Sequence, residues 1–72
     1  MRKIKKGCKY RHFKGDIITV LELAKDSETL EDLVVYIHNG QVWVRSLDMF
    51  LSKVDKEKYP NVTQTYRFEE IC

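Results

Sequence analysis

The residues of this chain with the clearest capacity for chemistry are a histidine near the amino terminus and a group of carboxylates further along. His12 follows Arg11, and Asp26, Glu28 and Glu31 lie in a short acidic stretch. A histidine held by a carboxylate can act as a general base near neutral pH, so His12 and Glu28 could serve a small enzyme. The alternative is a salt-bridged strap between the two segments. We favour the strap, because no nucleophile stands at a recognisable spacing.

A second candidate lies in residues 33–50, where two runs rich in β-branched and aromatic residues flank Asn39-Gly40. Asn-Gly between such runs is the strongest short-range hairpin signal, because a type I′ turn needs positive φ at both central residues. A two-residue loop also fixes the register of the hairpin. The expected cross-strand pairs are His38 with Gln41, Ile37 with Val42, Tyr36 with Trp43, Val35 with Val44, and Val34 with Arg45.

The predicted hairpin has two unlike faces, since side chains alternate along a strand. We expect the core face to be the one that carries Leu33, Val35, Ile37, Val42 and Val44. The other face carries Val34, Tyr36, Trp43 and Arg45. An aromatic pair beside a guanidinium can stack bases, bind proline-rich peptides or hold a cation. The alternative is that this face is a second core layer, covered by Tyr10 or Phe13 of the amino-terminal segment.

The chain is short, and its charge is unevenly distributed. Its 72 residues form one domain at most, in which a deep cavity is not expected. The net charge is +2, but seven of the thirteen Lys and Arg residues precede the first acidic residue, Asp16. We therefore divide the chain into a basic arm, residues 1–9, and a single small β-barrel domain, residues 10–72. The arm either solubilises a loosely ordered terminus or binds nucleic acid through Arg2, Lys3, Lys5, Lys6 and Lys9.

The two cysteines, Cys8 and Cys72, stand alone near the two ends of the chain. We expect free thiols in a reducing cytoplasm. The alternative is a disulfide between the two, which requires the two ends of the chain to meet. No Cys-x-x-Cys or Cys/His cluster occurs, so we predict no metal site, and we expect no cofactor. The charged start lacks an apolar segment after it, unlike a signal peptide, and no run of roughly 18 apolar residues occurs. We therefore expect a cytoplasmic protein without a membrane partner.

The remaining segments predict a small all-β fold. Asp16–Ala24 has apolar residues on both sides, which favours a strand covered on both faces. Ser46 is typical of the N-cap of a short helical turn, whose Leu47, Phe50 and Leu51 would plug one end of the sheet. Residues 26–32 and 55–65 are polar loops, and Thr65–Ile71 would close the fold as a strand. About five short antiparallel strands with one helical turn suggest a small barrel or a strongly bent sheet.

Several motifs resemble a small bacterial family known as domain of unknown function 1653. They are Tyr10-Arg11-His12-Phe13-Lys14-Gly15, Ser27-Glu28-Thr29, Glu31, Val34-Val35-Tyr36, Trp43-Val44-Arg45 and Met49-Phe50, in the family's order and spacing. The resemblance implies an SH3-like β-barrel in the cytosol and no assigned activity. The chain departs from the family pattern at Asp26, where histidine is usual, and at Ser46, where proline is usual.

These features favour a non-enzymatic binding module with a protein or peptide partner. The candidate ligand-binding residues are Arg11, His12, Glu28, Tyr36, Trp43 and Arg45. Two alternatives stay open: a nucleic-acid accessory module that uses the basic arm, and a small enzyme that uses His12 and Glu28. No catalytic residue is assigned.

Overall fold

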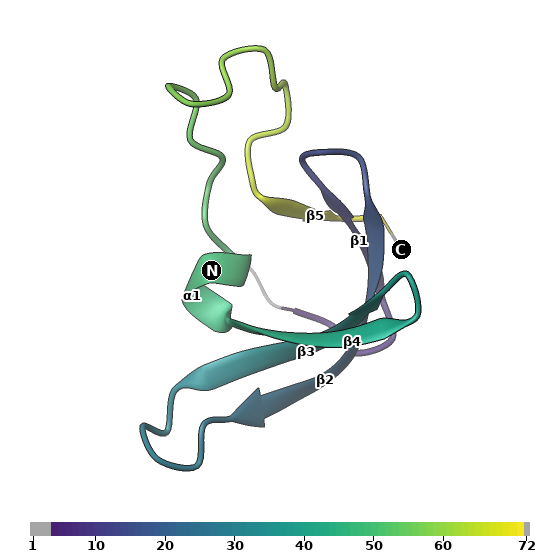
Figure 1. The fold of residues 1–72 in the computed structure, drawn as a ribbon, viewed down its shortest axis with the longest axis vertical. Helices are drawn as coiled ribbons and strands as arrows, with labels where there is room; N and C mark the ends of the chain where they lie inside the picture. Colours follow the sequence, from purple (N-terminus) through teal and green to yellow (C-terminus); the bar gives the residue numbers. More distant parts are fainter. Residues whose placement is uncertain (1–3, 72) are drawn as a thin grey trace.

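The computed structural model of this chain describes residues 4–71, and its main feature is one antiparallel sheet of five strands in the order β4-β3-β2-β1-β5. The elements are β1 (Lys9–His12), β2 (Ile17–Lys25), β3 (Asp32–His38), β4 (Gln41–Ser46), α1 (Leu47–Phe50) and β5 (Phe68–Glu70). The sheet curls into a C-shaped wall, and α1 lies at its open side (Figure 1). The predicted all-β fold, with five short antiparallel strands and one helical turn, is confirmed.

The β3–β4 hairpin has the predicted turn and the predicted register. Asn39 and Gly40 have φ of 52° and 76°, as a type I′ turn requires. The pairs run from His38 with Gln41 to Val34 with Arg45, without a shift. The local turn chemistry therefore determines which residues of the two strands face one another.

The core lies on the face of the hairpin that we did not expect. Val34 is 0% exposed and Tyr36 is 7% exposed. By contrast, Val42 and Val44 are 50% and 56% exposed on the convex side of the sheet. The prediction that Leu33, Val35, Ile37, Val42 and Val44 form the core face was therefore wrong, and the alternative of a core layer beneath Tyr10 is correct for Val34 and Tyr36. The reason is that the sheet curls toward the large aromatic rings, which need the enclosed side.

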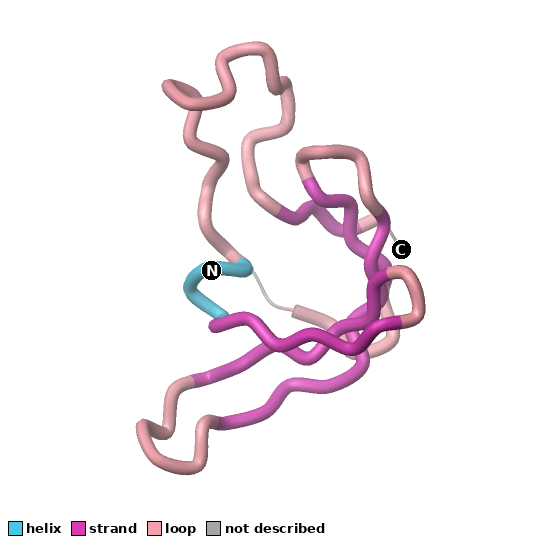
Figure 2. The backbone as a smooth tube through the Cα atoms, in the orientation of Figure 1, coloured by secondary structure: helices cyan, strands magenta, loops and turns pink. Residues whose placement is uncertain are grey.

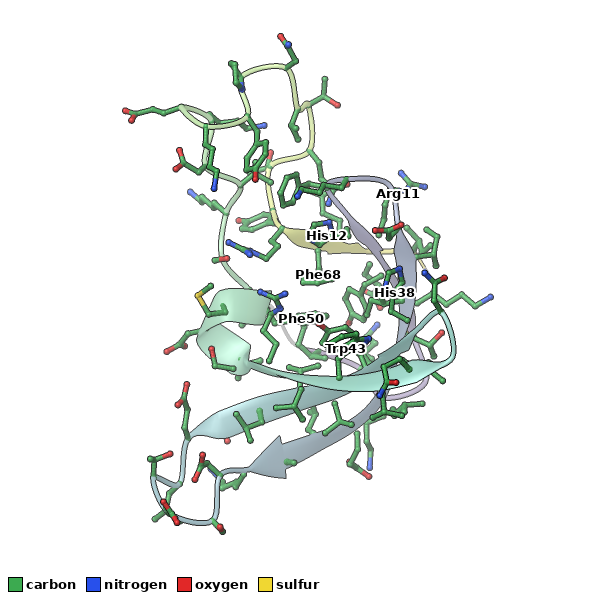
Figure 3. The ribbon with its side chains drawn as sticks, viewed as in Figure 1. Arg11, His12, His38, Trp43, Phe50 and Phe68 are labelled. Atoms are coloured by element: carbon green, nitrogen blue, oxygen red, sulfur yellow. The ribbon has the colours of Figure 1, made fainter. Side chains whose placement is uncertain are left out.

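Four aromatic rings fill the inside of the curve: those of Tyr10, Tyr36, Phe50 and Phe68. Phe50 and Phe68 stack with ring centroids 4.2 Å apart and planes 2° from parallel. Tyr10 meets Phe50 edge-on at 5.4 Å. Since Phe50 follows β4 and Phe68 lies in β5, the stack joins the two edge strands of the sheet, as the labelled rings in Figure 3 show.

The strand β2 contains an irregularity that the sequence did not reveal. Its register with β3 shifts between Val20 and Glu22, which leaves Leu21 as an extra residue. A bulge of this kind bends a strand and increases its twist. Before the bulge Ile18 and Val20 are buried, whereas Ile17, Leu21 and Leu23 are exposed. The prediction that this strand is covered on both faces was wrong.

The helical turn α1 forms as predicted. The Ser46 hydroxyl accepts a hydrogen bond from the backbone N–H of Met49 at 3.2 Å, which is the N-cap interaction. Phe50 is 0% exposed, and Leu47 packs against the same core. The plug predicted from this segment therefore sits on the aromatic core.

The segment after α1 forms a long loop before the short strand β5, and Figure 2 shows this loop extending beyond the sheet. The predicted closing strand Thr65–Ile71 is shorter in the structure, where only Phe68–Glu70 is a strand and Lys53 forms an isolated bridge with Tyr66. Within the loop, the Lys56 ammonium donates to the carbonyl oxygens of Val62 and Gln64 at 2.6 and 2.7 Å.

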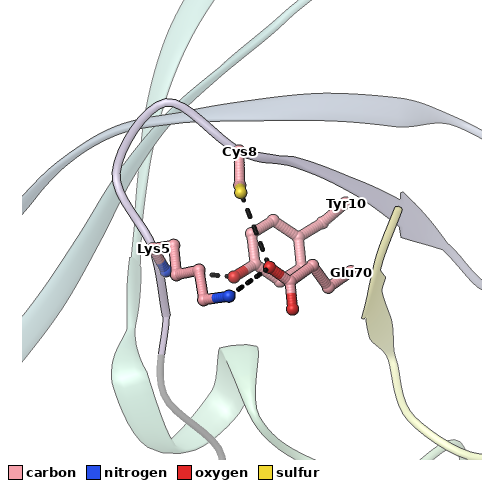
Figure 4. A network of polar contacts seen from close by, with 4 residues as sticks. All are labelled: Lys5, Cys8, Tyr10 and Glu70. Carbon is pink, nitrogen blue, oxygen red and sulfur yellow. Dashed lines mark hydrogen bonds and ion pairs between the residues drawn. The ribbon is translucent and has the colours of Figure 1, made fainter. Parts of the chain in front are cut away.

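The amino-terminal segment contacts the sheet before β1 begins. The backbone N–H of Lys5 donates to the Tyr10 hydroxyl at 3.1 Å, and the Lys5 ammonium lies 3.4 Å from a Glu70 carboxylate oxygen (Figure 4). Ile4 packs against the core and Lys9 lies within β1, so part of the expected arm belongs to the folded domain. Residues 1–3 lie outside the described residues.

Cys8 is buried beside this network and is disulfide-bonded. The expectation of a free thiol at Cys8 was therefore wrong, while Cys72 lies outside the described residues. The Cys8 sulfur lies 3.5 Å from a Glu70 carboxylate oxygen. A disulfide sulfur carries no hydrogen, so this contact is van der Waals packing.

No helix within residues 4–71 is long and apolar enough to cross a membrane.

The turn at Asn39-Gly40 gives a direct test of the fold. Gly40→Val should lower the free energy of unfolding by more than about 1 kcal/mol, because a β-branched residue resists positive φ. Gln41→Val, at the next position, should change it by less than about 0.5 kcal/mol. Urea denaturation of both variants checks this, and an unchanged midpoint for Gly40→Val would contradict the type I′ turn.

Candidate functional site

A hollow of about 140 Å³ opens on the inside of the curved sheet, and we call it the central hollow. Its lining residues are His12, Asp16, Ile18, Tyr36, His38, Arg45 and Phe68. Figure 3 shows His12, Phe68 and His38 on the inner side of the wall, whereas Arg11 points away from it. The strands β1, β2, β3, β4 and β5 and the β1–β2 turn therefore all meet at this place.

His12 is held by the turn that follows β1. Its backbone N–H donates to the Asp16 carbonyl at 2.7 Å, and its carbonyl accepts from the Gly15 N–H at 2.8 Å. The ring nitrogen Nδ1 accepts from the Lys14 backbone N–H at 3.2 Å. Because His12 lies opposite Phe68 in the β1–β5 pairing, the two rings meet edge-to-face at 5.0 Å.

Arg45 reaches the central hollow from the edge strand β4. Its pairing with Val34 places it on the inner face of the sheet, and its guanidinium lies 5.8 Å from the centre of the Phe68 ring. The Arg45 Nε atom is buried and has no hydrogen-bond partner within residues 4–71. An unpaired N–H of this kind is costly to leave unsatisfied.

The surroundings of His12 keep its imidazole neutral. Burial lowers the pKa of His12, and the positive charges of Arg45 and Arg67 lower it further. Lys14 adds to this repulsion, and among residues 4–71 Asp16 is the one group that raises the pKa. Since Nδ1 accepts a hydrogen bond, the proton of the neutral ring belongs on Nε2.

Asp16 and His38 face each other across the central hollow. The His38 Nε2 lies 3.7 Å from an Asp16 carboxylate oxygen, and the two form an ion pair when His38 is protonated. Within the described part of the chain, Asp16 is the one acidic side chain that lines the hollow, and it has a partner.

A second hollow of about 360 Å³ adjoins the first, and we call it the basic hollow. It is lined by His12, Phe13, Lys14, Arg45, Val54, Asp55, Lys58, Tyr59 and Arg67. His12 and Arg45 line both hollows, so they form the wall between them. Four cations and one carboxylate line the basic hollow, and Lys14 and Lys58 lie 5.6 Å from the Tyr59 ring centre. We call the two hollows together the groove.

Five of the six predicted ligand-binding residues fall into three groups in the structure. His12 and Arg45 line the groove, and Tyr36 lines the central hollow while also belonging to the core. Trp43 lies on the same inner face, 51% exposed, opposite Tyr36 in the register. Arg11 lies on the opposite face from His12, and its carbonyl oxygen accepts from the Gln64 side chain at 2.9 Å.

Glu28 is not brought to His12. Arg11 pairs with Ile17, at the first residue of β2, whereas Glu28 follows the last residue of that nine-residue strand. At roughly 3.3 Å per residue, the two sites lie at opposite ends of the sheet. The acidic loop also forms hydrogen bonds within itself in place of the predicted salt bridges to the Arg11-His12 segment. The Asp26 carboxylate accepts from the backbone N–H groups of Glu28 and Thr29, and these bonds lower the Asp26 pKa.

Of the described lysines of the basic arm, two lie beside carboxylates and the third belongs to a strand of the sheet. The Lys5 ammonium lies 3.4 Å from Glu70, and the Lys6 ammonium lies 3.3 Å from Glu22. Lys9 is exposed on β1. Arg2 and Lys3 lie outside the described residues.

The sequence interpretation missed Asp16, His38 and Phe68 as lining residues. The hairpin register carried a signal for His38, because residues 34, 36 and 38 share one face of a strand. No comparable signal existed for Phe68, whose place beside His12 depends on pairing between the two ends of the chain.

A family model described as "Protein of unknown function (DUF1653)" matches residues 8–70. The chain belongs to this family. The match begins at Cys8, within the segment that we had assigned to the basic arm. No curated protein and no solved structure matches the chain.

The exposure of Trp43 separates it from the core aromatic residues. Trp43→Ala should lower the free energy of unfolding by less than about 2 kcal/mol, whereas Phe50→Ala should cost about 3–5 kcal/mol. Denaturation curves, together with acrylamide quenching of Trp43 fluorescence in the native protein, check this. A shielded Trp43 whose loss costs as much as that of Phe50 would contradict its half-exposed position on the inner face.

The charges around His12 predict its titration. A nuclear magnetic resonance (NMR) titration of the folded protein should give His12 a pKa below 6.5, its ordinary value. The unfolded chain then binds this proton more readily. The free energy of unfolding should therefore fall as the pH drops from 6.5 to the lower folded-state pKa, and the His12 contribution should level off below it.

Arg45→Gln should raise the His12 pKa, because it removes one of the nearby positive charges. Lys25→Gln removes an equal charge at the far end of β2 and should leave it unchanged. A His12 pKa that does not respond to Arg45→Gln would contradict the proximity of the two side chains.

Proposed function

We propose that this protein is a non-enzymatic binding module that holds a segment of a partner polypeptide in the groove. The observation that supports this most is the wall formed by His12 and Arg45 between two adjoining hollows, with the half-exposed Trp43 on the same inner face. Trp and Arg are the residue types most often found at binding hot spots. An extended segment can cross such a wall and place one side chain in each hollow.

The dimensions of the central hollow favour a side chain over a whole small molecule. The central hollow measures about 140 Å³, whereas pockets for drug-sized ligands measure roughly 300–1,000 Å³. It also lies open at the inner face of a curved sheet. A hollow of this size suits one side chain of a longer ligand whose main chain continues along the surface.

Nucleic acid is the second candidate, because the basic hollow brings Lys14, Lys58 and Arg67 close to the aromatic ring of Tyr59. Cations interleaved with aromatic rings are typical of single-stranded nucleic-acid sites. We rank it second, since the Lys5 and Lys6 ammonium groups already face carboxylates. Ion pairs at an exposed surface are weak, so the two ligand classes are best separated by experiment.

We also propose a cytoplasmic location in a bacterium, as the family resemblance implied. The disulfide at Cys8 weighs against this location, because reducing compartments normally keep thiols reduced.

The test is a titration of the labelled protein with poly-L-glutamate, poly-L-lysine, a proline-rich peptide and a short oligothymidine, followed by amide NMR shifts. A polypeptide should shift the resonances of His12, Trp43 and Arg45, and Trp43→Ala should weaken its binding while the protein stays folded. Val44→Ala, on the convex face, is the matched control and should bind as the parent protein does. Binding of the oligothymidine alone, or shifts confined to the convex face, would overturn the proposal.

A further inference from the structure

We infer that the central hollow receives a carboxylate side chain, so that the partner is an acidic polypeptide and Arg45 is the residue that recognises it. This inference rests on the proposed function, since it names the ligand chemistry of the same groove. It is drawn from three features of the hollow: its charge, the unpaired Nε of Arg45, and the hydrogen-bond donor left on His12.

The charge around the central hollow is positive where the two hollows meet. Three cationic side chains, Arg45, Arg67 and Lys14, lie close enough to His12 to repel its protonated form. Asp16 is the acidic side chain that lines the central hollow, and it lies 3.7 Å from His38. A negatively charged group placed beside Arg45 would therefore be attracted by more charges than would repel it.

The guanidinium of Arg45 is positioned by an aromatic ring and has an unpaired donor, two features that suit a planar anion. Its carbon lies 5.8 Å from the centre of the Phe68 ring, and its buried Nε finds no acceptor within residues 4–71. A carboxylate that binds side-on accepts from Nε and a terminal nitrogen at once, which is the strong bidentate arrangement. Because the Nε is buried in the unliganded protein, the Arg45 side chain must turn toward the hollow for such a ligand to satisfy this unpaired N–H.

His12 supplies a neutral donor to the same hollow. Its Nδ1 accepts from the Lys14 backbone N–H, so the ring proton resides on Nε2. Burial and the neighbouring cations lower the pKa of His12 and keep the ring in this form at neutral pH. A carboxylate has enough lone pairs to accept from Arg45 and from His12 together.

The central hollow suits a carboxylate better than a phosphate. Among residues 4–71, Arg45 is the one permanently charged cation that lines the central hollow, and the Asp16 carboxylate also lines it. A terminal phosphate group carries close to two negative charges near neutral pH and three acceptor oxygens, so Asp16 would repel it more strongly than it repels a single carboxylate. The phosphodiesters of a nucleic acid carry one charge each, so nucleic acid is an outcome that the experiment must be able to show.

The experiment compares two short peptides, one of alternating Glu and Gly and one in which Gln replaces each Glu. The readout is the Nε–H resonance of Arg45 in a nitrogen-correlated NMR spectrum of the full chain. The Glu peptide should shift this resonance, and the Gln peptide should not. Arg45→Lys keeps the charge but loses the planar pair of N–H donors, and it should weaken binding by about tenfold or more. Since this variant has no Arg45 resonance, its affinity and that of the parent protein are compared through the ring resonances of His12. Lys25→Gln should change the affinity by less than about twofold.

The outcomes separate this inference from the proposed function. If both peptides bind equally, or if Arg45→Lys binds as tightly as the parent protein, the groove binds polypeptide but the carboxylate inference fails. If a proline-rich peptide or poly-L-lysine shifts the resonances of the groove residues and the Glu peptide does not, the inference fails in the same way. If only oligothymidine or inorganic phosphate shifts the Arg45 resonance, or if nothing does, both fail. A thermal unfolding curve for each variant shows that a loss of binding is not a loss of folding.

Discussion

The stacked rings of Phe50 and Phe68 connect two ends of a sheet that would otherwise lie open. Phe50 ends α1, directly after the edge strand β4, and Phe68 begins the other edge strand, β5. The rings are 0% and 2% exposed and stack at 4.2 Å. Stacked aromatic pairs contribute about 0.5–1.5 kcal/mol beyond the burial of their area. In a chain of 72 residues, this contact fixes the direction in which the sheet curls.

The direction of the curl determines the rest of the molecule. It places Val34 and Tyr36 inside and leaves Val42 and Val44 on the convex surface. It also brings Arg45 over the Phe68 ring, beside the ring of His12. The groove is therefore a consequence of how the core closes, because His12 and Arg45 come from strands that are not neighbours in the sheet.

Local features of the fold could be predicted from the sequence, and long-range ones could not. The Asn39-Gly40 turn, the hairpin register and the Ser46 N-cap depend on residues within a few positions of one another, and all three are as predicted. The choice of core face failed, because both faces of the hairpin carry apolar residues and only the distant Phe68 decides between them. The bulge at Leu21 was not predicted for a related reason, since a shift of register by one residue has no signal of its own in the composition.

The candidate site was predictable to the same extent. His12, Tyr36 and Arg45 were selected by residue type, and each lines the central hollow. Glu28 was selected by charge alone, and the length of β2 separates it from His12. Asp16 was missed because it was considered only as the first residue of the expected strand Asp16–Ala24, although its backbone carbonyl accepts from His12.

The most direct test of this account is a measurement of proton–proton contacts by nuclear Overhauser spectroscopy of the folded protein. The account predicts cross-peaks between the ring protons of Phe50 and Phe68, and between the Phe68 ring and the side chain of Arg45. Cross-peaks from the Phe68 ring to Val42 or Val44 in their place would show that the sheet curls the other way. That result would contradict both the core and the groove.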